Sequence, residues 1–192
     1  MTERRREKLI SVLRHRQPAL TVVMEDIHDP HNVSAILRSA DAVGVIEVQL
    51  VYVNEKFPKL GRKSSASANK WIKRRTFTSI KACYDTLHEE GFCIYATQLS
   101  AQSSSLYDLD LAGDVALVFG NEHRGVSEEA ARLADDNFQI PMTGMIQSLN
   151  VSVACAVTLY EAFRQRSLAG KYKKPQLSRT QLSAMVNEWT KK

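Results

Sequence analysis

The sequence predicts an α/β fold in which a mostly parallel sheet is covered by helices on both faces. Short apolar stretches alternate along the chain with longer stretches that have helical spacing, and a strand followed by a helix, repeated, is typical of a parallel sheet. The 192 residues, of which 44% are hydrophobic and 24% charged, suffice for one domain with a substantial core.

These patterns place the expected elements in order. Strands are expected at residues 20–27, 46–53, 93–98, 115–120 and 138–141. Helices are expected at residues 32–43, 79–90, 127–134 and 148–166, with terminal helices at 2–15 and 178–190. In the helix at 32–43, the apolar residues Val33, Ile36, Leu37, Ala40 and Val43 lie close to the spacing of one helical face.

The basic residues gather at the two ends of the chain. Residues 1–16 carry a net charge of +4 and residues 163–192 a net charge of +7, whereas the 146 residues between them carry −6. Two basic ends on an acidic body fit a polyanionic partner such as RNA, because phosphate neutralisation dominates nucleic-acid affinity. The side chains expected to contact RNA are Arg4, Arg5, Arg6, Arg14, Arg16, Arg124, Arg164, Arg166, Lys171, Lys173 and Lys174.

A third basic stretch lies at residues 56–75, where eight basic residues surround the sequence SSASAN. It is either a further RNA-facing surface or a solvated helix and edge strand, and the sequence leaves both interpretations open.

Neither a membrane span nor a secretory leader is predicted. The chain has no apolar run near 18 residues and no charged stretch followed by an apolar one at its start, so we expect a cytoplasmic protein without a membrane partner. Cys83, Cys93 and Cys155 show no CxxC or other metal-binding spacing. Free thiols and no metal site are therefore expected.

Three polar segments follow expected strands. They are DPHNVSAILRSADAVG at 29–44, LVFGNEHRGVS at 117–127 and IPMTGMIQSLNVSVACAVTLYEA at 140–162. Because ligands bind at the carboxyl ends of parallel strands, these segments are expected at one edge of the sheet. No G-x-G-x-x-G follows the first strand, where residues 25–29 read EDIHD, so an ordinary dinucleotide site is disfavoured.

In this order and at these separations, the three segments resemble the sequence motifs of the SpoU/TrmH branch of the SPOUT RNA methyltransferases. The resemblance extends from Arg5 to about Tyr172. It implies an α/β knot, with a deep trefoil knot in the C-terminal part, and a homodimer. It also implies three regions: a basic N-terminal helical extension at 1–18, a SPOUT methyltransferase domain at 19–166 and a basic C-terminal extension at 167–192.

The resemblance implies methyl transfer from S-adenosylmethionine to the ribose 2′-oxygen of guanosine 18 in the D-loop of tRNA, without a metal. Two alternatives stay open. One is a 2′-O-methyltransferase acting on another RNA, either ribosomal RNA or the wobble position of tRNA. The other is a non-catalytic RNA-binding protein with this fold.

Five residues are the catalytic candidates. By resemblance, Arg38 is central to catalysis, while Asn32, Glu122 and Asn150 shape the site around it. A guanidinium binds phosphate or stabilises a developing oxyanion more readily than it serves as a base, since arginine stays protonated in proteins. Glu122 is expected to orient Arg38 or Arg124. Ser148 either bonds a substrate phosphate or caps the following helix, and Asn32 is also a good helix cap.

For S-adenosylmethionine, the resemblance implies that backbone groups of the loops hold the donor in a bent form. The residues expected there are Leu99, Gly120, Asn121, Ile140, Met142, Gly144, Ser148 and Leu149.

Overall fold

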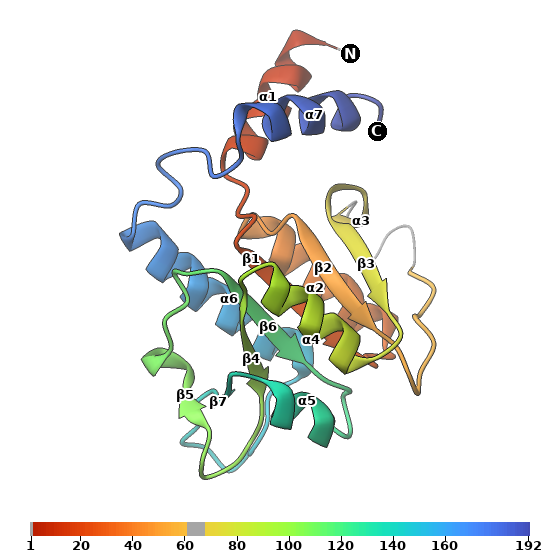
Figure 1. The fold of residues 1–192 in the computed structure, drawn as a ribbon, viewed down its shortest axis with the longest axis vertical. Helices are drawn as coiled ribbons and strands as arrows, with labels where there is room; N and C mark the ends of the chain where they lie inside the picture. Colours follow the sequence, from red (N-terminus) through yellow and green to blue (C-terminus); the bar gives the residue numbers. More distant parts are fainter. Residues whose placement is uncertain (1, 61–67) are drawn as a thin grey trace.

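The computed structural model describes residues 2–60 and 68–192. Within them, seven parallel strands form one sheet in the order β3-β2-β1-β6-β4-β7-β5 (Figure 1). The strands are β1 (Leu20–Glu25), β2 (Glu47–Val51), β3 (Lys73–Phe77), β4 (Cys93–Thr97), β5 (Ser104–Ser105), β6 (Val115–Phe119) and β7 (Asp136–Gln139).

Strands β1 and β6 lie side by side at the centre of the sheet, with Val22 opposite Leu117 and Met24 opposite Phe119. All residues of both strands are buried. This explains why they read as continuous apolar runs, since a parallel sheet in the middle of a domain is covered on both faces.

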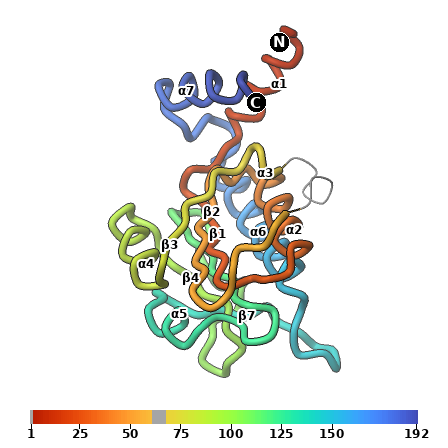
Figure 2. Tube along the Cα trace, turned by 90° about the vertical axis from the view of Figure 1, so that its right-hand side faces the viewer, coloured from red at the N-terminus to blue at the C-terminus, as the bar shows by residue number. Residues whose placement is uncertain are grey.

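Helices cover the two faces of the sheet. On one face lie α2 (Pro30–Ala42), α3 (Ala68–Trp71) and α6 (Val151–Leu168), which share a buried cluster with Val22 and Met24. On the other lie α4 (Ile80–Glu89) and α5 (Glu128–Leu133), which pack against Val23. Figure 2 shows the two layers on opposite sides of the strands. The predicted mostly parallel sheet with helices on both faces is confirmed.

The terminal helices α1 (Glu3–Arg14) and α7 (Arg179–Trp189) pack against each other at one end of the molecule (Figure 1). A separate apolar cluster holds them, made of Leu9, Leu13, Leu177, Met185 and Trp189. The rings of Trp189 and Trp71 lie 4.8 Å apart between centroids, which joins this helix pair to α3. The two basic ends of the chain therefore form one structural unit.

Most predicted elements begin and end within two or three residues of the observed ones. The helix predicted at 148–166 begins at Val151, after Asn150, whose side chain accepts a hydrogen bond from the Ser152 amide at 2.9 Å. The helix and edge strand that formed one interpretation of residues 56–75 are present as α3 and β3, whereas β5 and the 3-10 helix Leu106–Asp108 were not predicted. Residues 61–67 of the third basic stretch lie outside the described residues. The trefoil knot stays a prediction.

Two of the arginines predicted to contact RNA are buried, and that prediction is wrong for them. Arg166 donates hydrogen bonds to Gln17 Oε1 and to the carbonyls of Ala19 and Gly113, which ties α6 to the start of β1. Arg16 donates to the carbonyl of Val45, forms an ion pair with Asp41, and lies over the Trp189 ring. A charged group in such surroundings satisfies buried acceptors and has no access to a phosphate.

Replacing Arg166 with alanine should lower the free energy of unfolding by about 3 kcal/mol, because buried oxygen atoms lose their charged donor. Urea unfolding measures this change. Arg164→Ala is the matched control on the same helix. Its exposed side chain pairs with Glu161, so little change is expected. Equal effects of the two substitutions would show that burial of Arg166 does not determine stability.

Candidate active site

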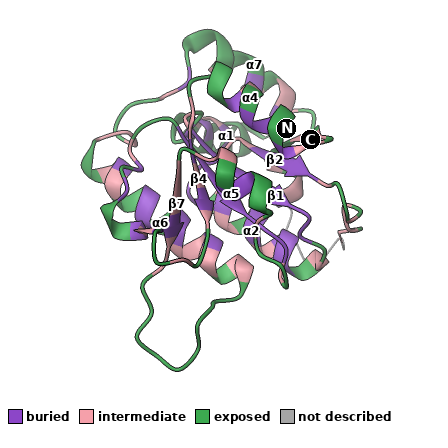
Figure 3. Ribbon diagram, turned by 60° about the horizontal axis from the view of Figure 1, so that its bottom comes forward, coloured by how far each residue is buried: buried purple, intermediate pink, exposed green. Residues whose placement is uncertain are grey.

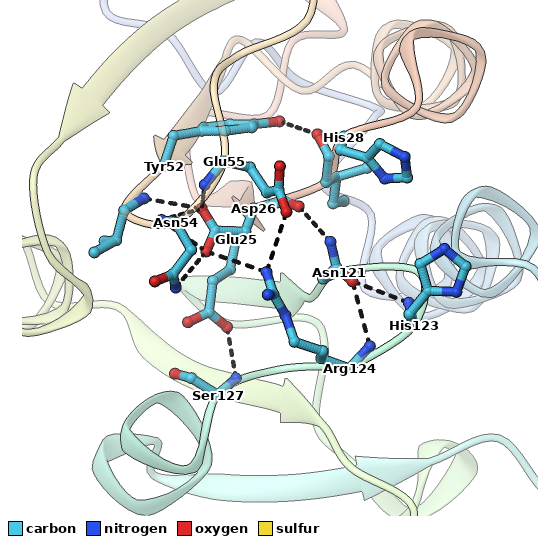
Figure 4. A network of polar contacts seen from close by, with 12 residues as sticks. Glu25, Asp26, His28, Tyr52, Asn54, Glu55, Asn121, His123, Arg124 and Ser127 are labelled. Carbon is cyan, nitrogen blue, oxygen red and sulfur yellow. Dashed lines mark hydrogen bonds and ion pairs between the residues drawn. The ribbon is translucent and has the colours of Figure 1, made fainter.

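The loops that leave the carboxyl ends of β1, β2 and β6 meet around Asp26 (Figure 4). Asp26 is buried and has a left-handed backbone with φ of 50°, a conformation that Asp tolerates better than most residues. Its carboxylate accepts hydrogen bonds from the backbone amides of Val53, Asn54 and Glu55 at 2.8 to 3.2 Å. These contacts fix the loop after β2 against the loop after β1.

Hydrogen bonding also determines the charge of Asp26. Burial disfavours the ionised form, but the bonds from the Asn54 side chain and from the amides of Val53, Glu55 and Asn54 outweigh it and lower the pKa of Asp26. Arg124 adds a distant cation, with its Nη2 at 3.9 Å from the carboxylate. The group is therefore an ionised carboxylate in the middle of three loops.

Asn121 connects the loop after β6 to Asp26. Its side-chain amide donates to the carbonyl of Asp26 at 2.9 Å, and its Oδ1 accepts from the amides of His123 and Arg124. Gly120 makes this tight turn possible, because a Cβ there would lie 2.1 Å from the carbonyl of Gly125. Any larger residue at position 120 would force the loop open.

Glu122 connects two of the segments found in the sequence. Its carboxylate accepts hydrogen bonds from the amides of His28 and Asp29, from His28 Nδ1 at 3.1 Å and from Asn32 Nδ2 at 3.0 Å. Burial raises the pKa of this carboxyl, but the hydrogen bonds, of which that from Asn32 is the largest, lower it to about 2. Since an ionised carboxylate can only accept, the Nδ1 atom of His28 carries the proton in this contact.

The third polar segment, at residues 140–162, is connected to Glu122 and Asn32 through Asn150. Its side-chain amide donates to Asn32 Oδ1 at 3.1 Å, so the amide group of Asn32 lies between Glu122 and Asn150. Asn150 is at the same time the N-cap of α6. The structure thus brings together three of the five predicted catalytic residues, one from each motif.

Arg38 and Ser148 take no part in this network. Arg38 is exposed on α2 and, among the described residues, has no hydrogen-bond or ion-pair partner. Arg124 pairs with Glu55 at 3.5 Å and lies near Asp26 rather than Glu122. A role of Glu122 in orienting Arg38 stays a prediction. Ser148 is exposed, and the helix cap is Asn150 instead.

A cavity of about 480 Å³ lies beside this network. Seven of the eight residues predicted to bind S-adenosylmethionine line it: Leu99, Gly120, Asn121, Ile140, Met142, Ser148 and Leu149. The eighth, Gly144, lines a neighbouring hollow of about 460 Å³ that shares Leu99, Ile140 and Met142. Figure 3 shows the loop between β7 and α6 extending from the body, exposed along residues 141–150.

The lining of the cavity suits a ligand with an aromatic ring and polar edges. Phe119, Phe138 and Val151 provide apolar surface, while Thr97 and Gln98 provide polar groups. Its volume lies within the range of about 300 to 1,000 Å³ that is usual for small-molecule sites. In the described part of the chain, no group of His, Cys, Asp or Glu side chains is arranged to hold a metal ion.

Sequence reasoning missed Asp26 and His28, both of which contact the motif residues. A signal was present, because two acidic residues, Glu25 and Asp26, stand at the end of a fully buried strand and directly after it. Glu25 accepts from the amide of Ser127, the N-cap of α5, at 2.9 Å. Acidic residues at the end of a buried strand therefore marked the loop junction.

Comparison with known proteins places this geometry in a family. Residues 19–160 match the model of the SpoU rRNA Methylase family. The chain belongs to that family. It is 45% identical, over 191 residues, to the tRNA (guanosine(18)-2′-O)-methyltransferase of Thermus thermophilus, covering 100% of this chain and 98% of the relative.

Two solved structures resemble the fold. The crystal structure of the A. aeolicus TrmH/SpoU tRNA modifying enzyme has a TM-score of 0.92 and 37% identity, covering 97% of this chain and 95% of that one. The SpoU methyltransferase AviRb from Streptomyces viridochromogenes, in complex with AdoMet, has a TM-score of 0.65 and 25% identity. The match covers 79% of this chain and 59% of that one. No helix among the described residues of the present chain is long and apolar enough to span a membrane.

The stability that Glu122 contributes should decrease in acid. Its folded pKa of about 2 lies below the ordinary value of 4.5, so its contribution is complete above about pH 4.5 and is lost as the pH falls towards 2. Glu122→Gln should be less stable than the wild type at about pH 7, and the difference should narrow below about pH 5. Urea unfolding across this pH range measures it. A constant difference would show that the charge of Glu122 does not stabilise the fold.

Proposed function

We propose that this protein transfers the methyl group of S-adenosylmethionine to the ribose 2′-oxygen of guanosine 18 in tRNA. The observation that carries the proposal is the hydrogen-bonded series Glu122, Asn32 and Asn150, of which Glu122 lines the 480 Å³ cavity. Near-full-length identity to a tRNA (guanosine(18)-2′-O)-methyltransferase supports the choice of substrate.

The residues around the cavity fit S-adenosylmethionine. Gly120, which lines the cavity, lets two loop backbones approach closely. Phe119, Ile140 and Leu149 offer apolar surface for the adenine ring. When bound, S-adenosylmethionine supplies a methyl group attached to a sulfonium, and the negative charge of Glu122 favours a cation nearby.

The chain's own residues then have to bind and orient the acceptor. In the reaction the 2′-oxygen would form a bond to the methyl carbon, the C–S bond would break to leave S-adenosylhomocysteine as the product, and the 2′-hydroxyl proton would pass to water. Exposed Arg38 is suited to holding the phosphate beside the target ribose and to stabilising negative charge on the oxygen. Asn32, fixed by Glu122 on one side and Asn150 on the other, is held in a single orientation for the acceptor. Such orientation can supply about 7 to 11 kcal/mol without a strong base.

The assembly and compartment form part of the proposal. A homodimer is supported by the apolar side chains that α6 leaves exposed, which include Val153, Tyr160 and Phe163. A cytoplasmic location follows from a tRNA substrate. A non-catalytic RNA-binding role is disfavoured, because Asn32, Arg38, Glu122 and Asn150 are all present and three of them are joined.

The decisive test is methyl transfer from radiolabelled S-adenosylmethionine to a tRNA transcript. We expect label in a transcript with guanosine at position 18 and none in one that already carries 2′-O-methylguanosine there. Transcripts of ribosomal RNA fragments and of tRNA differing only at the wobble nucleotide test the other acceptors. Preferential labelling of either of these would refute the assignment to guanosine 18.

Arg38→Ala should reduce turnover about 100-fold or more, which is usual for loss of a group that stabilises developing charge. The affinity for S-adenosylmethionine should change little, since Arg38 does not line the cavity. Arg38→Lys should also be severely impaired, because a single ammonium does not reproduce a bidentate guanidinium. Single-turnover kinetics and calorimetric titration measure the two properties. Normal turnover in the lysine variant would contradict the bidentate role.

A further inference from the structure

We propose that Lys56, Lys59, Lys70 and Arg74 form an RNA-binding surface that contacts the phosphate backbone of the bound tRNA. We call these four residues the edge surface, because they lie around β3, the edge strand of the sheet. The inference rests on the proposed tRNA substrate and assigns RNA binding to the third basic stretch, in addition to the side chains expected from the two basic ends of the chain and Arg124.

Packing brings these cations together from three parts of the chain. The guanidinium of Arg74 lies 5.6 Å from the centroid of the Phe57 ring, and that ring meets Tyr52 edge-on at 5.3 Å. The loop that carries Lys56 and Lys59 is thereby held against the edge strand. Lys70 lies in α3, a few residues before β3 begins.

The pairing of charges differs between the two faces of β3. Lys73 forms an ion pair with Glu188, and Arg75 forms one with Glu90. Arg74 lies between them, and because side chains alternate along a strand it points to the opposite face. Among the described residues, none of the four edge-surface cations has an ion-pair partner. Unpaired exposed cations in one place attract a polyanion.

The edge surface lies between the candidate active site and the terminal helices. At one end, the Asp26 carboxylate accepts hydrogen bonds from the amides of Val53 and Glu55, at the start of the loop that follows β2. Arg124 pairs with Glu55 of the same loop. At the other end, Trp71 packs against Trp189 of α7. The five residues of β3 span about 16 Å. Figure 1 shows β3 and α3 at one side of the sheet, below the terminal helices, so a tRNA that runs along this side from the terminal helices would meet the edge surface.

Protection of a sheet edge does not explain these charges. Lysines on edge strands prevent unwanted pairing with other strands, and Arg74 could serve in that way. Lys56 and Lys59 lie in a loop and Lys70 in a helix, where no free strand edge is exposed. Recognition of phosphate accounts for all four.

The test compares two matched double variants of the full-length protein. Lys56→Gln/Arg74→Gln removes one lysine and one arginine from the edge surface. The control Lys81→Gln/Arg132→Gln removes the same types from α4 and α5, on the other face of the sheet. We expect the slope of log affinity for tRNA against log salt to become shallower by about 1.8 in the first variant, or 0.9 for each lost contact. The control should keep the wild-type slope.

Kinetics provide a second readout. The edge variant should show a higher KM for tRNA, with kcat at saturating tRNA and the affinity for S-adenosylmethionine unchanged. Thermal unfolding reports whether each variant is folded. If the Arg74 substitution disturbs packing on Phe57, Lys56→Gln/Lys59→Gln gives the same test within the loop, with the same expected change in slope.

An unchanged slope in a folded edge variant, or an equal change in the control, would overturn the proposal. The proposed function can fail separately. A wild-type protein that binds tRNA but transfers no methyl group would refute the activity, while the comparison of salt slopes would still decide the role of the edge surface.

Discussion

The ionised carboxylate of Glu122 is the interaction on which the candidate active site depends. It accepts from Asn32, which is 90 residues away in the sequence, and Asn32 accepts from Asn150, which is 118 residues away. Since the carboxylate can only accept, it determines which side of the Asn32 amide faces it and which side faces Asn150. One charge thus orients two neutral side chains, one from the first turn of α2 and one from the N-cap of α6.

The parallel sheet makes this convergence possible. Strands β1 and β6 are neighbours with Met24 opposite Phe119, so the loops that follow them start side by side. Asp26 then turns the first loop through a left-handed conformation, and Asn121 of the second loop bonds to the Asp26 carbonyl. Because Asp26 also binds the loop after β2, a change at this residue would displace Asn32 and Glu122 together.

Local patterns in the sequence were sufficient for the fold class and for much of the site. The buried strands are mostly apolar, and the polar segments that follow them were expected at one edge of the sheet. The resemblance to the SpoU/TrmH branch then singled out Asn32, Glu122 and Asn150 within those segments. An edge strand within residues 56–75 was only one of two interpretations, and its bounds were not predicted, because the sequence of β3, Lys-Arg-Arg-Thr-Phe, is basic and lacks an apolar alternation. The left-handed turn at Asp26 was missed since no glycine marks it.

The sequence did not indicate which basic side chains are buried and which are exposed. Arg16, Arg166 and Arg74 are the same residue type, yet two are enclosed by carbonyls and carboxylates and one is exposed on a phenylalanine ring. A count of basic residues treats them alike. What separates them is whether the fold supplies acceptors, and acceptors such as the Ala19 and Val45 carbonyls belong to residues with no polar side chain. The cations available to a polyanion are therefore those that the backbone leaves unsatisfied, and only the folded chain determines which these are.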